Sequence, residues 1–315
     1  MTRPSDLQAI FDAFQRGSPY ASLEEVNRLL TKRMHEYNAR PQAELGGLSP
    51  DTVAQLLQGD WTSEGALRLN ERLTLDELAG AAILADARTL LAYVCDEGPV
   101  KCTVAGNLPR SAVAALLPQL RMHAERNVGF AREAERPKNE GDVCWLMELR
   151  TILMFGGLLV RRKGFRVTSR GRTLLVSDRA GELHALLFRT LFRKFDLRAL
   201  GYDDRHPGLQ QTVAYSFYKL RTAARDWASE QELAESAWLE SSKDPPSEWD
   251  EAHGDFRYHA FRNRVLDPLA SFGLLEHRSL PTDEKWIQRH EYRCSPLFGR
   301  FLTFELRGRV KGARR

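Results

Sequence analysis

Residues 157–172 read GLLVRRKGFRVTSRGR, and they carry the clearest local signal in the chain. Leu158, Leu159 and Val160 are apolar residues typical of a strand, and residues 165–168 alternate apolar and polar side chains as a returning strand does. The intervening residues 161–164, RRKG, are charged and end in a glycine, which tolerates the positive φ that tight turns require. The stretch therefore predicts a short basic β-hairpin.

Positive charge is concentrated at this hairpin. Between Val160 and Val176 there is no acidic residue but there are six basic ones, namely Arg161, Arg162, Lys163, Arg166, Arg170 and Arg172. The tail 307–315 adds five more, although the net charge of the whole chain is only +4. Concentrated positive charge attracts phosphate by releasing counterions, so the six residues are candidate contacts to a nucleic-acid backbone. The alternative is a solvated surface hairpin and a frayed tail.

The composition excludes a disordered chain and a membrane-spanning one. Hydrophobic residues make up 43% of the 315 residues, and the mean hydropathy is negative. No apolar run approaches the roughly 20 residues that a spanning helix needs. Four cysteines without CxxC spacing predict free thiols, and the N-terminus lacks the features of a secretion signal. We therefore expect a cytoplasmic protein of two or three domains, with no metal, no cofactor and no membrane partner.

Helix signals dominate the first 80 residues. Capping-box patterns at residues 22–25 and 74–77 each predict a helix start, and the first opens an amphipathic run. Ser49 and Pro50 predict a further short helix that extends through Leu57. No chemistry is apparent in this part, which we interpret as a packing or partner-contact region.

From residue 85 onward, the order of the predicted elements becomes informative. The patterns predict a helix to about Cys95, a strand-like piece at 100–103, a helix at 109–117 and another at 142–155, all before the hairpin. With residues 156–175, GGLLVRRKGFRVTSRGRTLL, this order resembles the winged helix-turn-helix superfamily, in which G-L-L, a basic turn and a T-x-x-G-R step recur. The resemblance implies that the hairpin is a wing. The link between the second and third helices is longer than in the compact pattern of that superfamily.

A second set of elements follows in the same order. Helices are predicted at 210–227, 229–239 and 256–272, and Gly273-Leu274-Leu275 repeats Gly157-Leu158-Leu159. Gly299-Arg300 corresponds to Gly171-Arg172 after a longer second hairpin. We therefore predict an α+β protein, mainly helical with small β-hairpins, made of two winged-helix units. The expected divisions are a helical N-terminal region (1–80), unit 1 (81–180), a helical connector (181–209), unit 2 (210–306) and a basic tail (307–315).

The two predicted third helices differ in character. Residues 142–155 are apolar at nearly every helical bearing, which predicts a buried helix that reads bases poorly. In residues 256–272 the apolar residues form one stripe, and Arg257, Asn263 and Arg264 lie on the other side. Arginine and asparagine are suited to guanine and adenine, so these three are candidate base contacts, with a solvated helix face as the alternative. Asp267-Pro268 predicts either a kink or a new helix start.

Catalytic signals are weak. The chain lacks the motifs of dinucleotide-binding folds, P-loops, HExxH zinc proteases and nucleophile elbows. Asp283-Glu284-Lys285 resembles the end of a nuclease motif without a partner carboxylate. Acidic and histidine groups at 203–206 and 250–259 have irregular spacing typical of solvated turns, and His290 with Cys294 is interpreted as strand packing.

The sequence thus favours a DNA-binding protein without enzymatic activity, with transcriptional control as a possible role and double-stranded DNA as the partner. The alternative is an assembly subunit, because tandem winged helices also resemble the dimerising accessory subunits of chromosome-organising complexes. That alternative implies a protein partner or a homodimer. The stretches ELGGLSP and GPVKCTVAGNL are similar to bacterial proteins, which implies no function.

Overall fold

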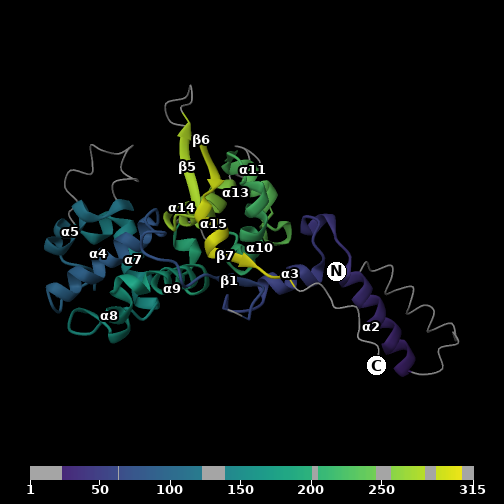
Figure 1. The fold of residues 1–315 in the computed structure, drawn as a ribbon, viewed down its shortest axis with the longest axis horizontal. Coiled ribbons are helices and arrows are strands. Elements are labelled where there is room, and N and C mark those ends of the chain that lie inside the picture. Colours follow the sequence, from purple (N-terminus) through teal and green to yellow (C-terminus); the bar gives the residue numbers. More distant parts are fainter. Residues whose placement is uncertain are drawn as a thin grey trace.

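The structure is a computed structural model and describes residues 23–62, 64–122, 139–200, 205–245, 257–280 and 289–306. Helices predominate in this part of the chain, and its strands form small antiparallel sheets, so the predicted α+β class is confirmed. Figure 1 shows two groups of helices on either side of the helix α9 (Ala180–Arg193), with the N-terminal helix α2 (Leu23–Ala39) running away from both.

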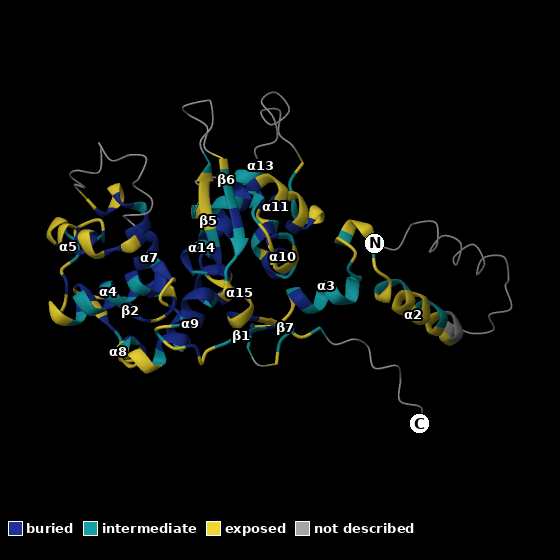
Figure 2. Ribbon diagram, turned by 45° about the horizontal axis from the view of Figure 1, so that its top comes forward, coloured by how far each residue is buried: buried dark blue, intermediate teal, exposed yellow. Residues whose placement is uncertain are grey.

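The N-terminal part consists of α2 and α3 (Pro50–Leu57). The Ser49 hydroxyl accepts a hydrogen bond from the backbone N–H of Thr52 (3.2 Å), and Pro50 occupies the first helical position, which confirms the predicted helix start. α3 packs against α10 (Gly208–Ala223), whereas most of the described side chains of α2 are exposed (Figure 2). The predicted cap at Ser22 lies outside the described residues.

The predicted helix start at Thr74 is wrong. Thr74 and Glu77 do make the reciprocal hydrogen bonds of a capping box, but turns come next and α4 (Ala82–Asp96) begins only at Ala82. In between, the backbone N–H of Leu78 bonds to the carbonyls of Thr74 and Leu75, and that of Ala81 bonds to the carbonyl of Leu78. These bonds span three or four residues and close isolated turns without continuing as a ladder, so the capping box here does not open a long helix.

The first group of elements contains the basic hairpin. Its helices are α4, α5 (Arg110–Leu116), α7 (Cys144–Phe155) and α8 (Ser169–Leu175), and its hairpin strands are β2 (Leu159–Arg161) and β3 (Phe165–Val167). The predicted hairpin is therefore confirmed. The strand-like piece expected at 100–103 is a single antiparallel bridge between Val100 and Phe165. Residues 123–138 of the long link lie outside the described part.

The second group repeats this order with longer strands. α10, β4 (Ala228–Ser229) and α11 (Glu230–Ala237) are followed by the third helix, the hairpin strands β5 (Leu275–Leu280) and β6 (Arg289–Cys294), and α15 (Pro296–Phe301). The sheet order is β4-β6-β5. In both groups the piece after the first helix pairs with the last strand of the hairpin. β7 (Leu302–Phe304) follows α15 directly and pairs with β1 (Leu67–Leu69).

The third helix of the second group is continuous but irregular. It consists of α13 (Arg257–Phe261), a π-helical turn (Arg262–Leu266) and α14 (Asp267–Ser271). Proline cannot donate the next helical hydrogen bond, and the wider π turn precedes Pro268, so the helix passes this residue without breaking. Each inserted residue rotates the remainder of the helix by about 100°, which changes the side on which later residues lie.

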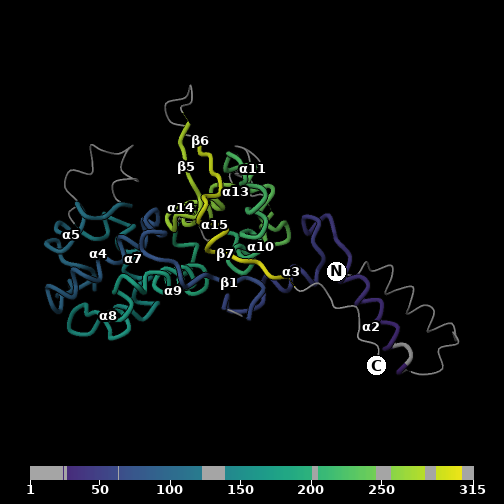
Figure 3. Tube along the Cα trace, in the orientation of Figure 1, coloured from purple at the N-terminus to yellow at the C-terminus, as the bar shows by residue number. Residues whose placement is uncertain are grey.

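α9 joins the two groups. It was predicted as a connector, and its side chains are buried at most positions. Phe188 and Phe192 pack against Phe217 of α10 with ring centroids 5.3 and 4.9 Å away, and against Phe272 at 5.1 and 6.2 Å. A single cluster of buried side chains accordingly extends from α4 through α9 to α15, and the trace in Figure 3 can be followed through the same elements.

Candidate nucleic-acid interface

The basic hairpin is held by apolar residues on one face. Leu159 pairs with Val167, and Phe165 pairs with Arg161; the three apolar residues are buried. Two glycines permit this close packing. A Cβ at Gly164 would lie 2.7 Å from the Val100 carbonyl oxygen, and one at Gly171 would lie 2.5 Å from that of Leu158. These contacts fix the turn and the start of α8 against the rest of the group.

All six basic residues predicted from the sequence are exposed, namely Arg161, Arg162, Lys163, Arg166, Arg170 and Arg172. None of them forms an ion pair with an acidic residue of the described chain. The guanidinium of Arg161 lies 3.4 Å from the Gly106 carbonyl oxygen and contacts the loop before α5. The hairpin thus presents positive charge without a neutralising partner in this part of the structure.

Lys101 belongs to the same surface and was missed by sequence reasoning. Its Cα would lie 3.5 Å from a Cβ at Gly164, which places it beside the hairpin turn, and it is exposed. Sixty residues separate Lys101 from the hairpin in the chain, and only the pairing of Val100 with Phe165 brings the two together. The alternation of apolar and polar residues around Val100 indicates a strand, but it does not specify which strand pairs with it.

α7 lies behind the hairpin, and most of its residues are buried, as its apolar pattern predicts, although Phe155 at its C-terminal end is exposed. Its Arg150 is almost fully buried and pairs with Glu140, with 2.6 Å between Nε and Oε1. The other oxygen of Glu140 accepts the backbone N–H of Leu108 (3.0 Å), and the Arg150 guanidinium lies 5.2 Å from the ring centre of Phe165. Arg150 therefore positions the hairpin from beneath and does not face solvent.

A second buried carboxylate fixes the start of the long link. Asp86 of α4 accepts the backbone N–H groups of Arg121 (2.7 Å) and Met122 (3.1 Å), and the indole N–H of Trp145 (3.2 Å). Burial raises the pKa of Asp86, although these donors favour its charged form. The carboxylate ties α4, the link and α7 together, so it serves the fold of the group.

The candidate base contacts on the third helix of the second group do not form an exposed face, and the predicted orientation is corrected here. Arg264 is buried, and its guanidinium donates to the Arg205 carbonyl oxygen at 2.6 Å. Arg257 and Asn263 are half-buried; Arg257 contacts the Asp244 carbonyl (3.4 Å), and Asn263 accepts from Arg262 (3.3 Å). Arg257 precedes the π turn, and Asn263 and Arg264 lie within it, so the three positions do not keep the relative orientation that a regular helix gives them.

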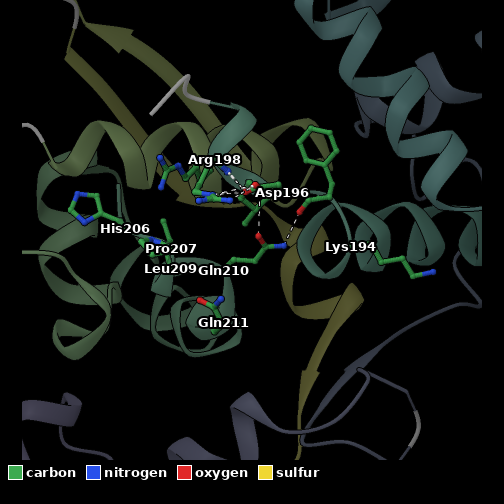
Figure 4. Close-up of a pocket in the computed structure, with 11 residues that line it drawn as sticks. Lys194, Asp196, Arg198, His206, Pro207, Leu209, Gln210 and Gln211 are labelled. Carbon is green, nitrogen blue, oxygen red and sulfur yellow. Dashed lines mark hydrogen bonds and ion pairs between the residues drawn. The ribbon is translucent and has the colours of Figure 1, made fainter. Parts of the chain in front are cut away.

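Arg264 lines a polar cavity of about 300 Å³ between the end of α9 and the start of α10 (Figure 4). Gln210 forms one wall, since its amide donates to the Phe195 carbonyl (2.7 Å) and accepts from the Leu197 N–H (3.3 Å). The carboxylate of Asp196 is paired with Arg198 at 2.7 Å. The lining therefore holds basic groups and amides, and its one acid is engaged in an ion pair.

Other chemical candidates in the described chain have structural roles. The ring of His206 is buried, and its Nδ1 accepts the backbone N–H of Asp244 at 3.0 Å. Burial raises the pKa of the Cys294 thiol to about 12, so it is not a thiolate at neutral pH. No group of three or more metal-ligating side chains occurs among the residues that the structure describes. Residues 203, 204, 250–253 and 283–285 lie outside them.

The comparison with protein-family models finds no match, and those with curated proteins and with solved structures find none either. Within the described ranges, every helix is too short or too polar to cross a bilayer.

Proposed function

We propose that this protein binds double-stranded DNA without catalysing a reaction, and that it contacts the phosphate backbone through the hairpin β2–β3. One observation carries the proposal. Seven exposed cations, Lys101 with the six predicted residues, lie on the hairpin, beside its turn or in the first turn of α8, and none has an acidic partner among the described residues. Such a surface gains affinity by releasing the counterions condensed on DNA. The four free cysteines fit a protein of the reducing cytoplasm.

The element order supports the view that both groups are winged helices. Each has a helix, a short β piece, two further helices and an antiparallel hairpin, and in each the short piece pairs with the second hairpin strand. In this arrangement the hairpin is the wing. The proposed role of residues 157–172 as a DNA contact follows from that position and from their charge.

Backbone contact is favoured over base reading in the first unit. A base-reading helix needs polar side chains that reach the major groove. α7 instead buries Arg150 in an ion pair with Glu140, and the residues around it pack into the core. We therefore expect affinity that depends steeply on salt and weakly on sequence.

The experiment compares duplex affinity of two triple charge reversals. R161E/R162E/K163E alters the hairpin turn, and R28E/K32E/R33E alters exposed residues of α2 by the same net charge. The hairpin variant is expected to lose most of its binding at low salt, and its salt slope should fall by about 0.9 for each phosphate that it no longer neutralises. The α2 variant should stay near the wild type. Unchanged affinity in the hairpin variant, or equal weakening in both, would overturn the proposal.

A second candidate is an assembly subunit, favoured by the absence of a base-reading surface on α7. In this case the wings and the exposed helix α2 would contact protein. A solution mass well above 35.9 kDa together with no retention on a duplex-DNA column at low salt supports assembly over DNA binding.

A further inference from the structure

The second hairpin carries two histidines that bond to one another. His277 of β5 faces Tyr292, and His290 of β6 faces Ser279, so the two histidines are diagonal neighbours on one face of the ribbon. His277 Nε2 and His290 Nδ1 are 2.9 Å apart, and the rings stack with centres 5.1 Å apart. The His277 ring also stacks on Tyr292 at 4.9 Å.

This face lies against charged groups from three helical segments. Tyr292 donates to Asp267 of α14 (2.6 Å), whose other oxygen lies 4.0 Å from Arg262 of the π turn. Arg262 also pairs with Glu230 of α11 at 3.0 Å. His259 of α13 interacts electrostatically with Arg262 and His290. One cation and two carboxylates therefore surround the three imidazoles.

On the opposite face of the ribbon, side chains of opposite charge form ion pairs with each other. Arg293 pairs with Glu276 (2.6 Å) and Arg278 with Glu291 (2.5 Å), and both guanidinium groups cover the ring of Trp227 at 4.7 and 4.4 Å. Histidine is the side-chain type whose ordinary pKa lies between pH 5 and 8. We therefore expect the histidine face to determine how this hairpin responds to pH.

The hydrogen bond between the rings limits how many protons the pair can hold. One ring nitrogen must offer a lone pair, so at least one of the two imidazoles is neutral while the bond persists. His277 is exposed and His290 half-buried. Partial desolvation is the main cause that lowers the pKa of both rings; the positive charge of Arg262 adds to it, and Asp267 opposes it. Burial raises the pKa of Glu230 to about 7, so the closed form binds a proton at this carboxyl more readily than an exposed carboxyl would, and this group opposes opening by acid.

We propose that the hydrogen bond between His277 and His290 is a proton-operated latch that ties β5 to β6 and opens when both rings are protonated. The closed form excludes a proton that the open form binds. An imidazole whose pKa is lowered in the closed form stabilises that form at pH values above its ordinary pKa near 6.5. At lower pH the open form binds the proton more readily, so opening is favoured. This latch is independent of whether the protein binds DNA.

Amide hydrogen exchange on the full chain tests the latch. Exchange rates, corrected for their intrinsic pH dependence, are compared between pH 7.5 and 5 for residues 275–280 and 289–294, with α4 as the internal reference. We expect opening of the hairpin to increase by up to tenfold per pH unit for each histidine involved, while α4 stays protected. A hairpin whose protection does not change with pH overturns the proposal.

The variant H277Q/H290Q replaces both rings by amides that bond to each other at every pH, and it should abolish the pH dependence. H35Q, on an exposed position of α2, is the matched control and should keep it. A double variant that opens with acid like the wild type would rule out the latch. Ring titration of the wild type by NMR gives an answer even if that variant does not fold: coupled titration below 6.5 supports the latch, and two independent titrations at the ordinary value overturn it.

Discussion

At the scale of single residues, His184 of α9 is unusual because its ring is fully buried and neither ring nitrogen has a hydrogen-bond partner in the described structure. The edges and faces of Phe272 and Phe301 surround it, with ring centres 5.1 and 4.6 Å away. Burial lowers the pKa of His184 to about 3. A buried polar group without a partner costs about 1–3 kcal/mol, so this residue opposes folding.

We predict that H184L keeps or raises the free energy of unfolding at pH 7 and weakens its acid dependence. In the wild type, the His184 ring of the unfolded chain is protonated below about pH 6.5, whereas that of the folded chain is protonated only below about pH 3. Stability should therefore fall by about 1.4 kcal/mol per pH unit across that window because of this residue alone. Urea unfolding between pH 7 and 4.5 measures the slope, with H35Q as the control. An H184L slope equal to that of the wild type would contradict this role for the buried ring.

At the scale of the element, Thr168 closes the basic hairpin onto α8. Its hydroxyl donates to the Gly157 carbonyl (2.8 Å) and accepts the Gly171 N–H (3.0 Å), so one side chain ties the start of the hairpin to the first turn of the helix. The backbone N–H of Thr168 adds a bond to the Leu158 carbonyl (3.0 Å). The hairpin strands are only three residues long, which makes this closure important for their order.

We expect T168A to destabilise the hairpin by about 1–2 kcal/mol, since it removes an N-cap and leaves a backbone donor unpaired. T168S keeps the hydroxyl and should remain close to the wild type. Hydrogen exchange of residues 158–167 measures the effect, and α10 serves as the reference element. Equal exchange in the alanine and serine variants would show that packing of Phe165 and Val167 alone holds the hairpin.

Sequence reasoning succeeded for elements whose signals are local. Alternating apolar and polar residues around a glycine turn predicted the hairpin, and Ser49-Pro50 predicted the start of α3. Apolar residues on nearly all sides of the helix predicted the burial of α7. It failed where distant or irregular backbone decides the outcome. Lys101 reaches the hairpin only through a bridge between residues 100 and 165. Arg264 lies within a π turn and is held inward by the Arg205 carbonyl, 59 residues earlier in the chain.

At the scale of the whole molecule, the relation between the two groups of helices was the least predictable feature. The pattern of residues 181–195 indicates a helix, but nothing local says that its aromatic residues fill a space between two other groups. In the structure Phe188 also meets Trp61 (5.8 Å) and Phe301 (5.2 Å), which come from opposite ends of the described chain. The pairing of β1 with β7 joins those same ends. These contacts favour one cooperative body over two units on a linker.

We therefore predict a single thermal unfolding transition that a core truncation in either unit shifts as a whole. Leu146 of α7 and Phe261 of α13 are fully buried in different groups of helices, and replacing either by alanine should cost about 2–5 kcal/mol. Because the buried cluster is continuous through α9, the destabilisation is shared by the whole body. Calorimetry should give one peak, with equal calorimetric and van't Hoff enthalpies, that moves down in both variants. Two peaks, one moved by L146A and the other by F261A, would instead establish independent domains with α9 as a simple connector.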